Sequence, residues 1–167
     1  MKNRRLRLPP EMQINIVAVG NRQAGWVDSG VDEYLKRFPP ELKVKINQVP
    51  AVKRGKSNNR QIVTRQEAER IDACIPGSHR LVVMDEKGKS LDTLALAKVI
   101  ESWMQEGINA SFVIGGADGV DTSLLKRADD VWNLSSFTLP HGLARILLIE
   151  QLYRAWTVIQ NHPYHRQ

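Results

Sequence analysis

The sequence predicts an α/β protein with a mostly parallel sheet and helices on both faces. Short runs rich in β-branched residues alternate along the chain with longer segments of helical periodicity. Apolar residues make up 42% of the chain and charged residues 25%, an ordinary balance for a globular protein. No linker or internal repeat divides the 167 residues, so we expect a single domain over residues 12–167.

The first half of the chain begins with a strand expected at residues 14–20, an apolar run that ends at a glycine. Apolar side chains at helical spacing then predict a helix over residues 26–38, which two prolines stop. Residues 43–49 alternate between polar and apolar and predict a second strand. Residues 50–60 lack an apolar period and predict a long mobile loop, followed by a polar helix over residues 61–74.

The second half repeats the order of strand and helix three times. We expect strands at residues 80–84, 111–114 and 131–134, and helices at residues 93–105, 122–129 and 143–160. Asp92 or Thr93 caps the first of these helices, and Gly107 fits its C-terminal end. A turn is expected at residues 85–88, where acidic and basic residues precede a glycine.

The last helix is unusually apolar, since twelve of the seventeen residues from 143 to 159 are apolar. That is more than a surface helix needs to cover one side of a core. Two interpretations remain open. The helix is either central and buried within one chain, or its second face is covered by another copy of the chain in a twofold dimer.

The net charge of +6 is concentrated at the N-terminus, because residues 1–12 carry half of it. We expect residues 1–11 to be a flexible basic extension, with Met12 as the true start. Cys74 is the only cysteine, which excludes an internal disulfide and fits a reducing compartment. No apolar run approaches the roughly 18–20 residues of a spanning helix, so we expect a cytoplasmic protein without membrane contact.

Three segments follow strands of the predicted sheet, at residues 84–88, 115–119 and 134–142. Ligands of open parallel sheets bind beyond the carboxyl ends of strands, so we expect one ligand site there. The glycine-rich run at 115–119 allows close backbone approach, but it is no phosphate loop, because no Gly-Lys-Ser/Thr follows. Hydroxyls, amides and apolar side chains in 134–142 suit an uncharged heterocycle such as adenine. Each segment alone could equally be a structural turn.

Two further clusters have a possible role in chemistry or RNA contact. Residues 162–166 contain two His, a Tyr and an Arg, which suit proton transfer, stacking or phosphate contact better than a frayed terminus. They do not suit a metal, because only four His exist and no carboxylate lies in the tail. Lys53, Arg54 and Lys56 lie in the long loop, where they form either an RNA clamp or a solvated surface.

Seven motifs together resemble one known family. They are VAVG at 17–20, EYLKRFP at 33–39, KRGK at 53–56, IGGADG at 114–119, LSSFTLPH at 134–141, LYRAW at 152–156 and NHPYHR at 161–166. This family is the RlmH family of bacterial 23S rRNA pseudouridine-1915 N3-methyltransferases, which belongs to the SPOUT class. The resemblance covers residues 12–167. Ala117 departs from it, because family members commonly have proline after the double glycine.

The resemblance implies a C-terminal deep trefoil knot, a homodimer, and S-adenosyl-L-methionine as cofactor. It also implies an enzyme that acts on 23S rRNA, on the assembled 70S ribosome. Carried over position by position, the cofactor contacts fall on Met84, Gly115, Leu134, Ser135, Ser136, Phe137, Thr138 and Leu139. No metal is expected.

The imide proton at N3 of pseudouridine must leave before that nitrogen can accept a methyl group. His165 is therefore expected to accept the proton, Tyr164 to stack or hydrogen-bond, and Arg154 to stabilise negative charge. Because the tail follows the apolar helix, it is expected to reach the cofactor of another copy. The alternatives are a non-catalytic ribosome-associated RNA-binding protein and a SPOUT enzyme that methylates another base or a ribose. An NAD-dependent oxidoreductase is a remote third, because the first strand lacks the phosphate-binding glycines.

Overall fold

The computed structural model describes residues 11–20, 22–57 and 59–166, and within them five strands form one parallel sheet. The sheet order is β2-β1-β4-β3-β5. The strands are β1 Met12–Val19, β2 Leu42–Val49, β3 Arg80–Ser90, β4 Ala110–Ile114 and β5 Asp130–Asn133. All neighbouring pairs run parallel, which confirms the predicted fold class.

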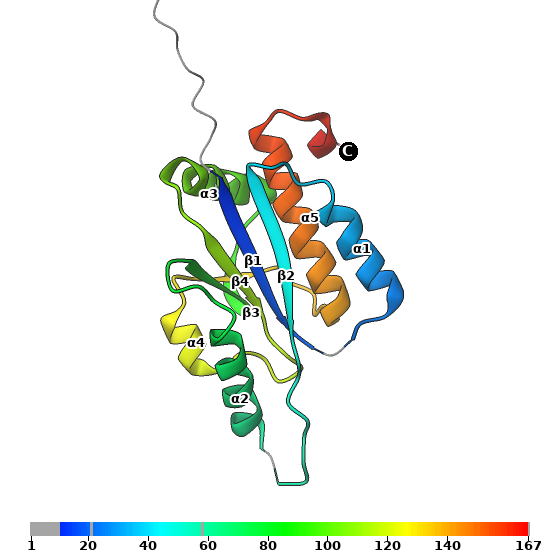
Figure 1. The fold of residues 1–167 in the computed structure, drawn as a ribbon, viewed down its shortest axis with the longest axis vertical. Coiled ribbons are helices and arrows are strands. Elements are labelled where there is room, and N and C mark those ends of the chain that lie inside the picture. The colour runs from blue at the N-terminus through cyan, green and yellow to red at the C-terminus, as the bar shows by residue number, and fades with distance from the viewer. Residues whose placement is uncertain (1–10, 21, 58, 167) are drawn as a thin grey trace, which may run out of the picture.

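Helices cover both faces of this sheet (Figure 1). They are α1 Gly25–Leu35, α2 Arg60–Asp72, α3 Thr93–Glu106, α4 Thr122–Arg127 and α5 His141–Ile159, with the 3₁₀ turn η1 at Pro163–Arg166. One buried cluster joins the sheet to α1, α3 and α5, and a second joins it to α2 and α4. Residues 1–10 of the expected basic extension lie outside the described residues.

Helix α3 begins and ends at the residues predicted to cap it. The Asp92 side chain accepts a hydrogen bond from the backbone N–H of Ala95 at 2.7 Å and thereby caps the first turn. Gly107 closes the helix with φ +69°, a left-handed conformation that favours glycine. Helix α4 begins at Thr122, as predicted, and its cap is Asp121, whose carboxylate accepts from the N–H of Ser123.

The prediction of a turn at residues 85–88 is wrong, because β3 continues through these residues to Ser90. Met84 and Lys89 both pair with Trp132 of β5, so the intervening residues form an irregularity within the strand. A Cβ on Gly88 would lie 2.6 Å from the backbone carbon of Trp132, so only glycine fits this approach. The local residues are typical of a turn, but pairing with a strand more than forty positions away extends β3 instead.

Helix α5 is buried on one side and apolar on the other. Ile149, Leu152 and Ala155 are fully buried against the sheet, while Leu143 and Leu147 stay 40% and 37% exposed. Trp26 of α1 is 61% exposed. A single chain therefore leaves large apolar side chains uncovered on α1 and α5.

Candidate functional site

The three segments predicted to meet at one edge of the sheet do so. Together they line a cavity of about 520 Å³ at the carboxyl ends of β4 and β5 and beside residues 84–87 of β3. This volume lies within the usual range of small-molecule sites. The convergence follows from the parallel sheet, because the strand order places β4 and β5 on either side of β3.

Seven of the eight residues proposed for cofactor contact line this cavity. They are Met84, Gly115, Leu134, Ser135, Phe137, Thr138 and Leu139. Ser136 is exposed and does not belong to the lining. Phe137 lies at the rim, because its side chain is 84% exposed.

Side-chain hydrogen bonds hold the loop after β5 in a series of short turns. The N–H of Ser135 donates to Asn133 Oδ1 at 2.9 Å, and the N–H of Phe137 donates to Ser135 Oγ at 2.9 Å. These are the local bonds by which Ser and Asn shape turns. The Ser135 hydroxyl thus shapes the loop as well as facing the cavity.

The glycine loop at residues 115–119 is tight enough to require its glycines. The N–H of Gly119 donates to the carbonyl of Gly116 at 3.0 Å, and Gly119 has φ +83°. A Cβ on Gly115 would lie 2.6 Å from Val120 Cγ2 and 3.0 Å from the Gly119 carbonyl oxygen. The shape of this loop therefore requires residues without a side chain, as its glycine-rich sequence predicts.

Several charged side chains line the cavity besides the apolar and hydroxyl groups of residues 134–142. Asp85, Glu86 and Lys87 line one wall, and Asp118 lines another. Arg54 from the basic loop forms an ion pair with Asp118, including an Nε–Oδ2 hydrogen bond of 3.1 Å.

The basic loop is therefore tied to the glycine loop. Arg60 strengthens the connection, since its Nε donates to the carbonyl of Asp118 at 3.0 Å. Of the three residues proposed for RNA contact, Arg54 takes part in this ion pair, and Lys53 and Lys56 are exposed.

Three buried or half-buried polar groups have no role predicted from the sequence. Glu67 is 4% exposed and accepts from the N–H of Val52 at 3.1 Å. Arg145 is 1% exposed and donates from Nη2 to the carbonyl of Val19 at 3.3 Å. Burial, together with the nearby Arg145 charge, lowers the pKa of His141, a cavity-lining residue at the start of α5.

The sequence does contain a signal for two of these groups. Glu67 lies four residues from Val63 and from Ile71, on the buried face of α2. Arg145 lies on the buried face of α5, four residues before Ile149. A charged residue on an apolar helical stripe indicates a buried charge, which is rare unless it has a specific role.

The tail folds back onto α5 and is not frayed. Tyr164 donates from its hydroxyl to Glu150 Oε1 at 3.1 Å. Arg154 forms an ion pair with the same carboxylate at 2.6 Å and lies 4.9 Å from the centre of the Tyr164 ring. Burial and the contact with Tyr34 raise the pKa of Tyr164 well above its usual range, so its hydroxyl stays protonated.

His165 lies half-buried in the same turn. Its Nδ1 is buried and has no hydrogen-bond partner among the described residues. The structure therefore brings together the three residues proposed for catalysis, Arg154, Tyr164 and His165, around the end of α5.

The tail follows the C-terminal end of α5 (Figure 1), whereas the cavity is lined by residues at the N-terminal end of this helix. His141 lines the cavity at the first residue of this 19-residue helix. Arg154 lies about 20 Å further along, at 1.5 Å per residue. Within one chain, the proposed catalytic residues therefore do not reach the proposed cofactor residues.

Neither a metal cluster nor a membrane helix is found in the part of the chain that the structure describes. No three His, Cys, Asp or Glu side chains there are grouped to hold a metal ion. No helix there combines the length and the apolar character needed to cross a bilayer.

The comparison with protein families now defines the class. A family model described as "Predicted SPOUT methyltransferase" matches residues 12–165. The chain therefore belongs to the SPOUT family of methyltransferases, which confirms the resemblance carried by its motifs. It is an enzyme of the methyl-transfer class.

Within that class, the chain is similar to proteins named Ribosomal RNA large subunit methyltransferase H. The protein of that name from Ralstonia pickettii (strain 12J) is 49% identical over 155 residues, covering 93% of this chain and 99% of the relative. Relatives of the same name from Burkholderia thailandensis and Burkholderia lata are 48% and 47% identical, with the same coverage. The likeness extends over nearly the whole of both chains.

Proposed function

We propose that this methyltransferase modifies ribosomal RNA of the large subunit, with S-adenosyl-L-methionine as methyl donor. Relatives named for that substrate match 93% of the chain. The observation that carries the proposal is the cavity of about 520 Å³, which is surrounded by the glycine loop and the loop after β5. Both loops offer backbone groups and apolar walls to a flat ligand.

The residues around the cavity fit this cofactor. Gly115 has no room for a side chain against Val120 and Gly119, which keeps the loop tight, and Met84 and Leu139 would supply apolar walls. Asp85 and Glu86 place negative charge beside a ligand that carries a positive sulfonium. The cofactor supplies a methyl group that is already activated, so these residues need only hold and align it.

The proposed target atom is N3 of a pseudouridine, at position 1915 of 23S rRNA. Its proton has to leave, and His165 Nδ1, which is buried and without a partner in the described chain, is the proposed acceptor. Tyr164 stays protonated because its pKa is raised, so it acts as a hydrogen-bond donor and not as a base. Arg154 carries the positive charge that stabilises the deprotonated ring.

The proposed active site is shared between two chains. Arg154 lies about 20 Å along α5 from the cavity-lining His141 of its own chain, and the tail packs on the C-terminal half of the same helix. Trp26, Leu143 and Leu147 form the exposed apolar patch that a twofold partner would cover. We further propose the trefoil knot of the family in the C-terminal part of the chain. The proposed substrate is the cytoplasmic 70S ribosome, contacted by Lys53, Arg54 and Lys56.

The decisive experiment is mass spectrometry of rRNA from cells that lack this gene. One methyl group should be missing from one pseudouridine of 23S rRNA, and the purified enzyme should restore it. A missing methyl on a ribose or on another base would instead indicate a different SPOUT enzyme. If rRNA from these cells carries all its methyl groups, and calorimetry detects no binding of S-adenosylmethionine, the results would indicate a non-catalytic RNA-binding protein.

The role of His165 has its own test. His165→Ala should slow methyl transfer about 100-fold, the usual scale for a lost general base, and change cofactor affinity less than about twofold. His79→Gln, in a half-buried histidine outside the tail, should leave both quantities unchanged. Full activity of His165→Ala would remove this residue from the mechanism.

A further inference from the structure

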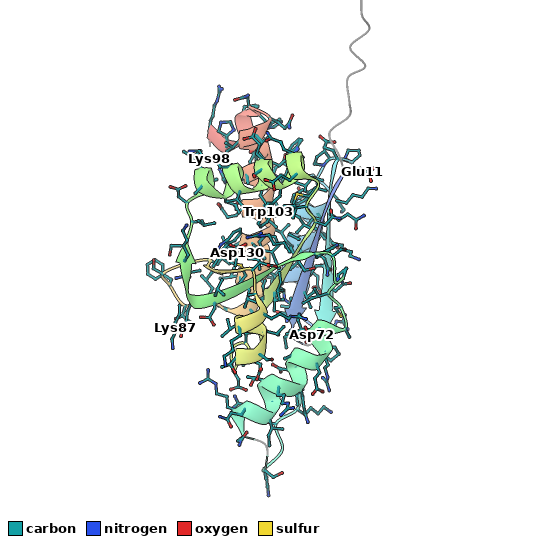
Figure 2. The ribbon with its side chains drawn as sticks, turned by 90° about the vertical axis from the view of Figure 1, so that its left-hand side faces the viewer. Glu11, Asp72, Lys87, Lys98, Trp103 and Asp130 are labelled. Carbon is teal, nitrogen blue, oxygen red and sulfur yellow. The ribbon has the colours of Figure 1, made fainter. Side chains whose placement is uncertain are left out.

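A second cavity lies between α3 and the edge of the sheet formed by β3 and β5. It has a volume of about 350 Å³ and shares no lining residue with the first cavity. We call it the α3 groove, and its main lining residues are Arg80, Lys89, Lys98, Ser102, Trp103 and Trp132. Figure 2 views this side of the molecule and labels Lys98 and Trp103 on α3, with Asp130 on β5.

The groove has an excess of positive charge that comes from its two lysines. Arg80 is already paired, because its Nε donates to Asp130 Oδ2 at 2.7 Å. Its guanidinium also lies 5.6 Å from the centre of the Trp103 ring. Lys89 and Lys98 are exposed, and neither forms an ion pair with any residue that the structure describes. Two lysines without an ion pair among the described residues therefore line one concave surface.

The wall behind these lysines is aromatic and rigid. The rings of Trp103 and Trp132 stack at 5.7 Å with 7° between their planes, and both residues are less than 10% exposed. Phe112 packs against both rings and completes the support. The groove therefore combines a rigid aromatic wall with two lysines that form no ion pair among the described residues, a combination that suits an extended anionic chain.

The groove and the first cavity adjoin across the β3–β5 edge. Lys87 lines the first cavity and Lys89 lines the groove, with Gly88 packed on the Trp132 backbone between them. On the neighbouring strand, Asn133 lines the first cavity and Trp132 lines the groove. A polymer seated in the groove therefore lies within a few residues of the methyl-transfer site.

We propose that the α3 groove binds the sugar–phosphate backbone of the substrate RNA, outside the nucleotide that is methylated. Lys89 and Lys98 each contact a phosphate, which positions the RNA without reading its sequence. The proposal rests on the RNA substrate proposed above, but not on which nucleotide is modified. The groove would be a second RNA contact beside the basic loop, in which Arg54 is already paired with Asp118.

The test compares Lys89→Gln/Lys98→Gln with a matched double variant. Lys45→Gln/Lys126→Gln serves as the control, because Lys45 lies on β2 at the opposite edge of the sheet and Lys126 on α4. Both control lysines are exposed and line neither cavity. The substrate is the ribosome from cells that lack the gene, and the KM for ribosomes is measured over a series of salt concentrations.

The groove variant should raise the KM for ribosomes about tenfold. The slope of log KM against log salt should fall by about 0.7–0.9 for each lost phosphate contact. The kcat and the calorimetric Kd of S-adenosylmethionine should stay within about twofold of the wild type, as should all values of the control. Ser102→p-benzoylphenylalanine, placed in the groove, should cross-link to 23S rRNA on irradiation.

Two results overturn the groove proposal alone. One is a groove variant whose KM and salt slope equal those of the control, and the other is a cross-link to a ribosomal protein instead of rRNA. A wild-type enzyme that fails to methylate these ribosomes would overturn the proposed function itself, and the groove proposal with it. Methylation by the wild type with an unaffected groove variant would overturn the groove proposal alone.

Discussion

Replacing Gly115 by alanine tests whether the glycine loop forms the proposed cofactor seat. The added Cβ would lie 2.6 Å from Val120 Cγ2 and 3.0 Å from two backbone atoms of Gly119. The Val120 side chain can rotate, but the Gly119 backbone cannot move alone, because it is hydrogen-bonded to Gly116 at 3.0 Å. The whole loop therefore has to open, and Gly119 and Val120 both line the cavity.

Overpacking of this kind costs about 1–3 kcal/mol of unfolding free energy. For a chain of this length the melting temperature should fall by about 2–12 °C, at about 2–4 °C per kcal/mol. The affinity for S-adenosylmethionine should fall by at least about tenfold, because the walls of the seat have moved. Differential scanning calorimetry and isothermal titration calorimetry measure these two quantities.

Gly77→Ala is the matched control, since a Cβ at that position would meet nothing within 4 Å. Its melting temperature and cofactor affinity should equal those of the wild type. An unchanged cofactor affinity in Gly115→Ala, with a lowered melting temperature, would refute the cofactor seat while leaving the loop geometry intact. If both quantities stay unchanged, the close packing of this loop is itself wrong.

Three further variants test the polar side chains at the two ends of α5. In His141→Gln, the loss of stability on acidification should be smaller than in the wild type, as measured by urea unfolding at pH 5.5 and 7.5. The reason is that burial lowers the pKa of His141 in the folded protein, so below about pH 6.5 only the unfolded chain takes up this proton. An equal acid-side decline in both proteins would contradict this. Arg154→Ala should cost about 1–3 kcal/mol of unfolding free energy, because Glu150 is only 8% exposed and loses its ion pair. Tyr164→Phe should cost less, about 0.5–1.5 kcal/mol, since one hydrogen bond to Glu150 is lost; a larger loss than in Arg154→Ala would reverse the proposed ranking.

Most of the fold could be predicted from the sequence, because its signals are local. The β-branched run of β1 and the two caps of α3, Asp92 and Gly107, each act within a few residues. The cavity could be predicted as well, because the ends of parallel strands meet at one edge whatever the details of packing. The segments after β4 and β5 line one cavity for that reason, together with residues 84–87 within β3.

Other parts of the site could not be predicted from local patterns. The Asp-Glu-Lys-Gly sequence at 85–88 favours a turn, but β5 pairs with it and extends β3. The α3 groove depends on Trp103 and Trp132, which stack although they lie far apart in the chain. Glu67 and Arg145 did leave a signal, as charged residues on apolar helical stripes, yet only the structure identifies what surrounds them.

The sequence by itself determined the alternation of strands and helices, the parallel sheet and the three segments that build the cavity. Each of these follows from the conformational preferences and periodicity of neighbouring residues. The tertiary structure alone decided the position of the tail, which packs on the C-terminal half of α5, and the second groove beside β5. Both result from contacts between residues distant in the chain, which are set by packing the whole molecule and are not encoded in any short segment.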